Sequence, residues 1–201
     1  MHRGMIVDLK LCIGCNTCAI ACKAKNGTGP GVFWRKVLEQ EVGVFPLARR
    51  IFWSIGCMHC EDPLCVQVCP TGATYQREDG LVLIDGNKCT GCKACMLACP
   101  YDARSLWKGR ERYFEKGLTP YEAKVYATHV SGAVQKCDFC VDRLDKGLQP
   151  YCVETCPTGA LIFGDLDDPK SDIEQALGEP RVHYRLKEEL GTRPSVYYLT
   201  Y

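Results

Sequence analysis

The pattern of apolar and polar positions predicts short strands near the start of the chain. Residues 5–8 (MIVD) form an apolar strand candidate that leads into a cysteine-rich loop. Residues 32–38 and 49–55 alternate apolar and polar side chains loosely, which predicts two strands on either side of the EVGVFP turn. None of these segments is long enough to form a large core by itself.

The same pattern predicts further strands in the middle and at the end. Residues 74–76 and 81–84 flank REDG and predict a hairpin, with Gly80 at the position that needs a positive φ. Residues 160–163 are apolar and strand-like, and so is the final VYYLTY segment.

Helices are predicted to be equally short. Residues 18–22 have the composition of one helical turn, and residues 186–190 are a second candidate. Thr119 is a candidate N-cap with Pro120 at the first helical position, and another helix should follow Pro169.

Cysteines at three-residue steps add a second pattern. Residues 89–100 read CTGCKACMLACP, which is the C-x2-C-x2-C-x3-C-P run of bacterial ferredoxins. Three closely stepped thiolates can hold one 4Fe-4S cluster only in a tight loop, and Gly91 allows that loop to turn. Pro100 ends the helical turn that begins before it, so Cys99 is directed toward a different cluster.

Three more runs account for all 16 cysteines. The first run is Cys12, Cys15, Cys18 and Cys22, the second is Cys57, Cys60, Cys65 and Cys69, the third is Cys89, Cys92, Cys95 and Cys99, and the fourth is Cys137, Cys140, Cys152 and Cys156. Lys23 replaces the final proline of the first run, and three runs continue alike as CPTGA, CPYDA and CPTGA. This internal repeat predicts four all-cysteine 4Fe-4S clusters.

Composition and charge narrow the class of protein. The formal charge of the 201 residues is +1, and four oxidised clusters of about −2 each would bring the loaded protein to roughly −7. Nucleic acid is therefore not expected as a partner. The sequence has no apolar run long enough to span a bilayer, and its first 11 residues lack the features of a signal peptide.

Other uses of the cysteines fit less well. Structural zinc has no role for a third cysteine three residues after a C-x2-C pair, and disulfides cannot readily join neighbours in one tight loop. His59, inside CMHC, is expected to donate to a ligand or to pack, because thiolates already complete each set. His2, His129 and His183 have no ligand-spaced partners and are interpreted as surface or structural residues.

The crossover of the fourth thiolate predicts how the runs pair. The second and third runs are spaced as in a two-cluster ferredoxin, which leaves the first and fourth to pair with each other. The expected ligand sets are Cys12, Cys15, Cys18 and Cys156 (cluster 1), Cys22, Cys137, Cys140 and Cys152 (cluster 2), Cys57, Cys60, Cys65 and Cys99 (cluster 3), and Cys69, Cys89, Cys92 and Cys95 (cluster 4). Pairing the first run with the second and the third with the fourth needs no long-range closure, but it would divide the most regular module.

These patterns together predict an α+β fold of duplicated, bacterial-ferredoxin-like modules, with short hairpins and short helices around the clusters. Residues 1–48 with 136–163 should form one two-cluster module, and residues 49–106 the other. Residues 107–135 are a cysteine-free insertion that either meets a partner, shields a cluster or is a tolerated loop. Residues 164–201 should pack along the modules or contact another subunit, with Tyr197, Tyr198 and Tyr201 as possible interface anchors.

The motifs resemble those of a known family. CIGCNTCAIACK, CMHCEDPLCVQVCPTGATYQREDG, CTGCKACMLACPYDAR, KCDFC with CVETCPTGALIFGDLDD, and GTRPSVYYL are similar to the four-cluster iron-sulfur subunits of the dimethyl sulfoxide reductase and polysulfide reductase group. The resemblance implies electron relay between a molybdenum or tungsten pterin catalytic subunit and a quinone-reactive membrane subunit or another carrier. It also implies a peripheral protein that reaches the membrane through its partner, on a side that the sequence does not indicate.

The chain itself shows no catalytic constellation, so we expect a non-catalytic electron-transfer subunit, with a free polyferredoxin carrier as the alternative. Its own chemical task is then to set cluster potentials. Candidate cations for raising them, because positive charge favours the reduced cluster, are Lys10, Lys23, Lys88, Lys93, Arg104 and Lys136. The other interpretation of each is a solvated surface charge.

Overall fold

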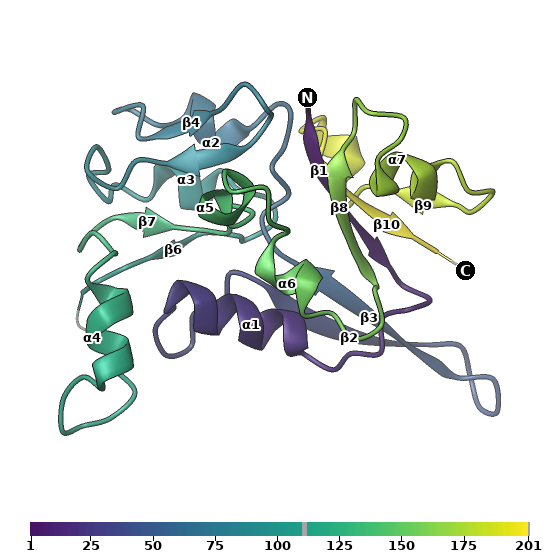
Figure 1. Cartoon of the computed structure of the whole chain (residues 1–201), viewed down its shortest axis with the longest axis horizontal. Helices are drawn as coiled ribbons and strands as arrows, with labels where there is room; N and C mark the ends of the chain where they lie inside the picture. Colours follow the sequence, from purple (N-terminus) through teal and green to yellow (C-terminus); the bar gives the residue numbers. More distant parts are fainter. Residues whose placement is uncertain (110–111, 201) are drawn as a thin grey trace.

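A computed structural model describes residues 1–109 and 112–200 (Figure 1). The strands are β1 (Arg3–Asp8), β2 (Lys36–Val42), β3 (Arg49–Ile55), β4 (Thr74–Gln76), β5 (Val82–Ile84), β6 (Ser105–Leu106), β7 (Val134–Gln135), β8 (Leu161–Asp165), β9 (His183–Tyr184) and β10 (Val196–Leu199). The helices are α1 (Thr17–Asn26), α2 (Leu64–Gln67), α3 (Ala94–Leu97), α4 (Pro120–Tyr126), α5 (Val141–Leu144), α6 (Tyr151–Glu154), α7 (Asp172–Leu177) and the 3-10 helix η1 (Glu188–Leu190). Short helices and short strands alternate along the chain, which confirms the α+β prediction.

Both ends of the chain meet in one four-stranded sheet. The strand order is β8-β1-β10-β9, with β1 antiparallel to β8 and parallel to β10. The centre of β1 is fully buried at Met5, Ile6 and Val7, since α7 covers one face and the cysteine-rich core the other. The predicted strands at 5–8 and 160–163 are therefore confirmed, with bounds shifted by a few residues.

The tail packs against the rest of the chain, which is one of the two roles expected for it, but one of its expected anchors is not at the surface. Tyr198 is 0 % exposed and packs between Trp53 and Tyr184, so it is not the interface anchor that the sequence suggested. Tyr197 is half-buried against Arg185, and Tyr201 lies outside the described residues. The tail packs into the fold because its strand lies between β1 and β9.

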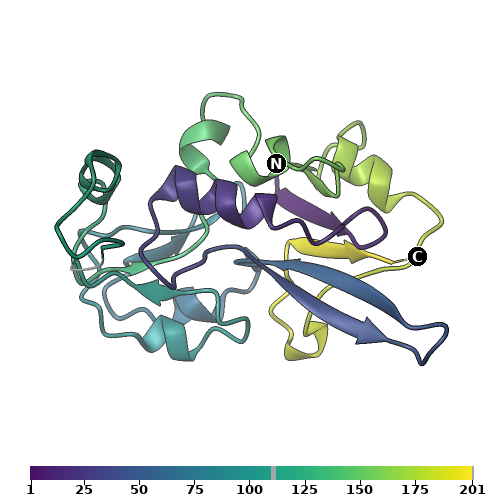
Figure 2. The same cartoon turned by 90° about the horizontal axis from the view of Figure 1, so that it is seen from below.

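The strands β2 and β3 form a long hairpin that extends away from the body (Figure 2). The first of them begins at Lys36, four residues later than predicted, and the second occupies the predicted residues 49–55. Val44, Phe45 and Leu47 at the tip are largely exposed, whereas the other end of the hairpin packs against the core.

The predicted REDG hairpin lies apart from the four-stranded sheet, in a second half of the molecule that also holds α2, α3, β6 and β7 (Figure 1). Thr74 pairs with Ile84 and Gln76 with Val82, and Gly80 has the expected positive φ of 82°. Helices α2 and α3 pack beside this hairpin, on the left of Figure 1, and β6 pairs with β7 across the insertion.

The insertion packs on the end of α1. Its helix α4 begins at the predicted N-cap, where Thr119 and Glu122 form a capping box. Gly27 ends α1 with φ 55°, and a side chain added there would collide with Val125 of α4, so glycine is needed for both reasons. The insertion therefore has a structural role in closing the end of α1, whether or not it also meets a partner.

One hydrophobic core joins the two halves. It contains Met5 and Tyr198 from the sheet together with Leu81 from the other half. Four cysteines belong to the same core: Cys18, Cys57, Cys137 and Cys152. Among the residues that the structure describes, no helix is long and apolar enough to cross a membrane.

Candidate iron-sulfur cluster sites

All four runs use the same backbone device in their first loop. The residue before the second cysteine has a positive φ in every run, 71° at Gly14, 42° at His59, 67° at Gly91 and 55° at Phe139. The left-handed conformation reverses the chain between two cysteines, so that both thiols turn toward one side. Two of the four positions are glycine, as expected, and the other two carry rings.

The C-P-T-G-A repeat forms a second shared element. Thr71 and Thr158 place their hydroxyls 3.8 Å from the sulfurs of Cys69 and Cys156. In both copies the glycine N–H donates to the cysteine carbonyl at 3.3 Å. The third run makes the same turn with Asp102, at φ 49°, in place of glycine.

Two of the expected ligand sets line separate cavities. One cavity is bordered by Cys57, Cys60, Cys65 and Cys99, with Pro63, Pro100 and Tyr101 around them. The other is bordered by Cys12, Cys15, Cys18 and Cys156, with Ile13 and Pro157 around them. In each case one thiol comes from a different run, because the final cysteine of a run is directed to another group.

The other eight cysteines have more varied surroundings. Cys22, Cys137, Cys140 and Cys152 are all buried, and their thiols influence one another electrostatically. Cys69 accepts from the Thr74 N–H at 3.3 Å, and Cys89 accepts from the Val134 N–H at 3.4 Å. Cys92 is exposed and Cys95 is buried. In the described part of the chain no three His, Cys, Asp or Glu side chains come as close together as a single metal ion would need.

The donor set fits iron-sulfur clusters chemically. Thiols that point into shared cavities, accept backbone N–H bonds and have no disulfide partner are the environment that such clusters occupy. Two buried guanidinium atoms, Nε of Arg35 and one terminal nitrogen of Arg104, have no hydrogen-bond partner among the described residues and lie in thiol-rich surroundings. An anionic group between these thiols would compensate both charges.

Burial raises the pKa of seven of these thiols. Burial, together with the negative charge of a neighbouring thiolate, raises the pKa of Cys22 and of Cys60 to about 12. The neighbour is Cys152 for Cys22 and Cys57 for Cys60. At Cys69 burial acts in the same direction, but hydrogen bonds from Thr74 and Thr71 outweigh it and lower the pKa to about 7. Ligation requires thiolates, so cluster binding must release protons from the buried thiols.

His59 is a buried bridge between the halves and not a ligand. Its Nδ1 accepts from the Val82 N–H at 3.1 Å, so its Nε2 carries the proton and donates to the Cys137 carbonyl at 3.0 Å. Burial, and to a smaller extent the positive charge of Lys136, holds the pKa of His59 well below its usual value and keeps the ring neutral. The ring stacks on Phe139 at 3.8 Å between centroids. The expectation of a packing or donor role is confirmed.

The remaining histidines are surface or structural residues, as predicted. His2 pairs with Ser195 at 2.9 Å, and His129 bonds the Asn26 carbonyl at 2.9 Å beside Trp107. His183 lies in the short strand β9.

The candidate cations divide into two groups. Lys10, Lys88 and Lys93 are exposed, and Lys23 binds the carbonyls of Thr28, Gly29 and Val32. Arg104 and Lys136 are buried near the Cys65 thiol; burial raises the pKa of that thiol, and the two positive charges oppose part of the rise. Arg35, which is 2 % exposed, was not among the predicted cations, because at least 12 residues separate it from every cysteine run in the sequence.

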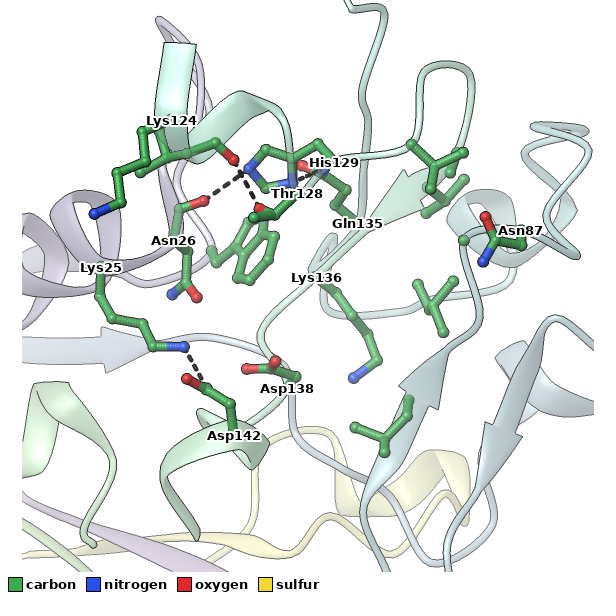
Figure 3. Close-up of a pocket in the computed structure, with 18 residues that line it drawn as sticks. Lys25, Asn26, Asn87, Lys124, Thr128, His129, Gln135, Lys136, Asp138 and Asp142 are labelled. Carbon is green, nitrogen blue, oxygen red and sulfur yellow. Dashed lines mark hydrogen bonds and ion pairs between the residues drawn. The ribbon is translucent and has the colours of Figure 1, made fainter. Parts of the chain in front are cut away.

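A further cavity lies apart from these sites. It measures about 690 Å³ and lies between the end of α1, the loop after α4 and β5 (Figure 3). Lys25 forms an ion pair with Asp142 on its wall, and His129 bonds the Asn26 carbonyl there. No cysteine is among the described residues that line it.

Comparison with known proteins assigns the class. A 4Fe-4S dicluster domain matches residues 48–117 and 108–166, and a 4Fe-4S binding domain matches residues 9–26. These matches cover all four cysteine runs, so the chain is a ferredoxin-like 4Fe-4S protein.

Relatives extend the similarity to almost the whole chain. A subunit of selenate reductase from Mesobacillus selenatarsenatis is 44 % identical over 98 % of this chain and 71 % of its own length. The iron-sulfur subunit of arsenate respiratory reductase from a Shewanella species is 36 % identical over 99 % of this chain and 96 % of its own. A component of polysulfide reductase from Wolinella succinogenes is 40 % identical over 96 % of this chain and 92 % of its own length. The chain belongs to this family of iron-sulfur electron-transfer subunits of reductases, and its 16 cysteines provide for four 4Fe-4S clusters.

Proposed function

We propose that the chain relays single electrons through four clusters in a line, between a molybdenum or tungsten pterin catalytic subunit and a quinone-reactive membrane subunit. Bound 4Fe-4S clusters supply one-electron chemistry, and the chain's own residues hold and insulate them. The chain is then non-catalytic and peripheral, and it reaches the membrane through its partner.

The proposal includes the ligand sets expected from the sequence, clusters 1 to 4. The two four-thiol cavities support clusters 1 and 3, because each contains one cysteine from the partner run. Mutual electrostatic influence among Cys22, Cys137, Cys140 and Cys152 supports cluster 2. Cluster 4 follows as the remaining set.

The proposal also includes two duplicated modules. The first and fourth runs would form one module, supported by the contact of α1 with α6 and the pairing of β1 with β8. Residues 49–106 would form the other, supported by the contact of α2 with α3. The shared positive-φ loops and C-P turns are what a duplication would leave in each.

One observation carries the idea of a relay: the order of exposure along the proposed line. Cys15 of cluster 1 and Cys92 of cluster 4 are exposed, whereas no ligand of clusters 2 and 3 is. His59, from the loop of cluster 3, binds the carbonyl of Cys137, a ligand of cluster 2, so the two inner clusters are neighbours. A line whose exposed cysteines belong to its two outer clusters suits transfer between partners at its ends.

Each of the two cysteine runs with an exposed cysteine also has exposed apolar side chains. Ile13 and Ile20, each 59 % exposed, lie in the first run, and Leu97, 89 % exposed, lies in the third. Apolar side chains next to an exposed ligand suit a covered contact better than a free carrier, so this feature favours a subunit over a free polyferredoxin.

Anaerobic purification of the native complex tests the relay. About 16 iron atoms per chain should accompany a pterin-bound molybdenum or tungsten subunit, at four iron per site. Added quinol should reduce the clusters, and the acceptor of the catalytic subunit should reoxidise them. A monomer that carries all its iron and has no partner would instead support the free carrier, and stoichiometric zinc in place of iron would contradict both.

Serine variants test the crossover in the ligand sets. Cys99→Ser should change the electron paramagnetic resonance signal of cluster 3 and leave cluster 4 nearly intact, and Cys69→Ser should do the reverse. Both variants remove the last cysteine of a run, so they are matched in position. If each variant perturbs the cluster of its own run, the pairing is wrong.

A further inference from the structure

Arg35 is an unusual residue for the interior of a protein. It is 2 % exposed and is the largest fully buried side chain of the described residues. Its terminal nitrogens donate to Ser54 Oγ at 3.0 Å and to Met5 Sδ at 2.9 Å, and its Nε has no partner. Within the described chain no carboxylate forms an ion pair with it. A guanidinium remains charged under such conditions, so an anion must compensate it.

The surroundings of Arg35 come from two proposed clusters. Ser54 links it to the thiol of Cys18, at 3.5 Å from Oγ to Sγ, and Cys18 belongs to cluster 1. Its other electrostatic neighbours are Cys22, Cys137 and Cys152, all of cluster 2. Burial alone would lower the pKa of Arg35, whereas these thiolates raise it above its usual value.

Arg104 repeats this arrangement in the other half. It is 6 % exposed and donates to Thr74 Oγ1 at 3.1 Å, and the Thr74 N–H donates to the thiol of Cys69 in cluster 4. Its electrostatic neighbours are Cys57 and Cys65 of cluster 3 and Cys95 of cluster 4. One of its terminal nitrogens has no partner in the part of the chain that the structure describes. Each half therefore holds one buried arginine, and a residue with a hydroxyl links it to a ligand.

We propose that Arg35 and Arg104 are equivalent bridging cations, each shared by the two clusters of its half, and that each raises the reduction potential of both. The physical reason is that reduction adds a negative charge to a cluster, and a fixed, desolvated positive charge favours that state. One charge between two clusters acts on both in the same direction. The potentials of the two clusters in one half should therefore shift together. The inference rests on the proposed ligand sets.

Redox titration followed by electron paramagnetic resonance tests the inference on the complete complex. Arg35→Gln should shift the potentials of clusters 1 and 2 to more negative values and leave clusters 3 and 4 in place. Arg104→Gln should give the opposite pattern. Arg35→Lys retains the positive charge and should lie between Arg35→Gln and the unmodified protein. Arg50→Gln, which removes an exposed arginine of the hairpin, is the matched control and should shift none of the four.

Each outcome of the titrations either supports or overturns the bridging role of Arg35. Unchanged potentials in Arg35→Gln with full iron content, or an equal shift of all four clusters, would overturn the bridging role. Loss of clusters 1 and 2 from Arg35→Gln but not from Arg35→Lys would support it, because Arg35→Lys retains the positive charge that Arg35→Gln removes. Loss from both would overturn it in favour of a purely structural role. Iron content measured on the unmodified complex separates these results from a failure of the proposed function, which would show as absent clusters before any substitution.

Discussion

At the scale of single residues, one backbone position serves different purposes in the four runs. Glycine takes the left-handed conformation at positions 14 and 91 at little cost, whereas His59 and Phe139 take it with full side chains. Their rings stack on each other at 3.8 Å, in a buried site that links the second and fourth runs. The strain at both positions is therefore offset by the contact that joins the two halves.

Asp8 is a second residue whose role depends on burial, because its carboxylate is charged inside the protein. It is 3 % exposed, accepts from two nitrogens of Arg181 at 2.6 and 2.8 Å, and accepts from the Lys10 N–H just before the first cysteine loop. Burial alone would raise the pKa of Asp8, but the bonds from Arg181 and Lys10 outweigh it and hold the pKa below its usual value.

We predict that Asp8→Asn lowers the free energy of unfolding by about 1.5–3 kcal/mol at pH 7, the value of hydrogen bonds to a charged group. A carboxylate with a depressed folded pKa contributes stability above its unfolded pKa and loses it as pH falls through the folded value. The difference between the two proteins should thus be full above about pH 5 and shrink below about pH 4. Anaerobic urea unfolding at several pH values measures it, and a difference independent of pH would show that the charge is unimportant.

At the scale of elements, α1 extends beyond the single turn predicted from its cysteines. The sequence indicates residues 18–22, and the helix continues to Asn26 because side chains of the insertion bond to the carbonyls at its C-terminal end. Tyr121, Tyr113 and His129 bond the carbonyls of Ala24, Thr28 and Asn26. These contacts join residues about 100 positions apart, so no local pattern could predict them.

Removing the two tyrosine hydroxyls should loosen this end of α1. The double variant Tyr113→Phe with Tyr121→Phe retains both rings, and each lost hydrogen bond should cost about 0.5–1.5 kcal/mol. Hydrogen exchange should become faster at residues 23–28 and remain unchanged in β1. Tyr75→Phe, an exposed tyrosine of the REDG hairpin, is the control. Unchanged exchange at the end of α1 would mean that the insertion does not stabilise it.

The last strand was predicted as a strand but not as an internal one. Pairing with β1 places Val196 beside Met5 and Tyr198 beside Val7, and the Tyr198 hydroxyl donates to the Ser54 carbonyl at 3.1 Å. The segment VYYLTY alone cannot distinguish an internal strand from an exposed one, since apolar and aromatic residues suit both. Its position depends on a parallel pairing between the two ends of the chain.

Neighbouring tyrosines in this strand provide a matched pair. Tyr198→Ala should cost about 3–5 kcal/mol, as for other large buried aromatic residues, and should lower the iron content because Ser54 contacts Cys18. Tyr197→Ala, at the half-buried neighbour, should cost much less and retain the iron. Anaerobic unfolding and iron analysis of both variants test this. If both variants lost the same stability and the same iron, Tyr198 would not have the internal role that its burial indicates.

At the scale of the whole molecule, the cysteine runs predicted more than the hydrophobic pattern did. Ligand chemistry restricts spacing severely, so the runs indicated the class, the number of clusters and the C-P turns directly. The buried arginine at position 35 has no comparable signal. Its role depends on where β2 and β3 place it, between loops that are far apart in the chain. A long-range contact of this kind is visible only in the folded structure.

The exposure pattern leads to a final prediction, which concerns the isolated chain. Cys15 and Cys92 are its exposed cysteines among the described residues, and Cys22, Cys137, Cys140 and Cys152 are all buried. A small anionic oxidant such as ferricyanide, applied with an alkylating reagent, should therefore attack the two outer clusters first. Peptide mass spectrometry should find Cys15 and Cys92 alkylated earliest and the four buried cysteines latest.

In the complete complex both early sites should be protected, since partners would cover the two ends of the line. Ile13→Glu and Leu97→Glu should each restore reactivity at one end only, because a carboxylate weakens an apolar contact locally. Early alkylation of the four buried cysteines would contradict the linear order. Unprotected ends in the active complex would show that electrons pass through another surface.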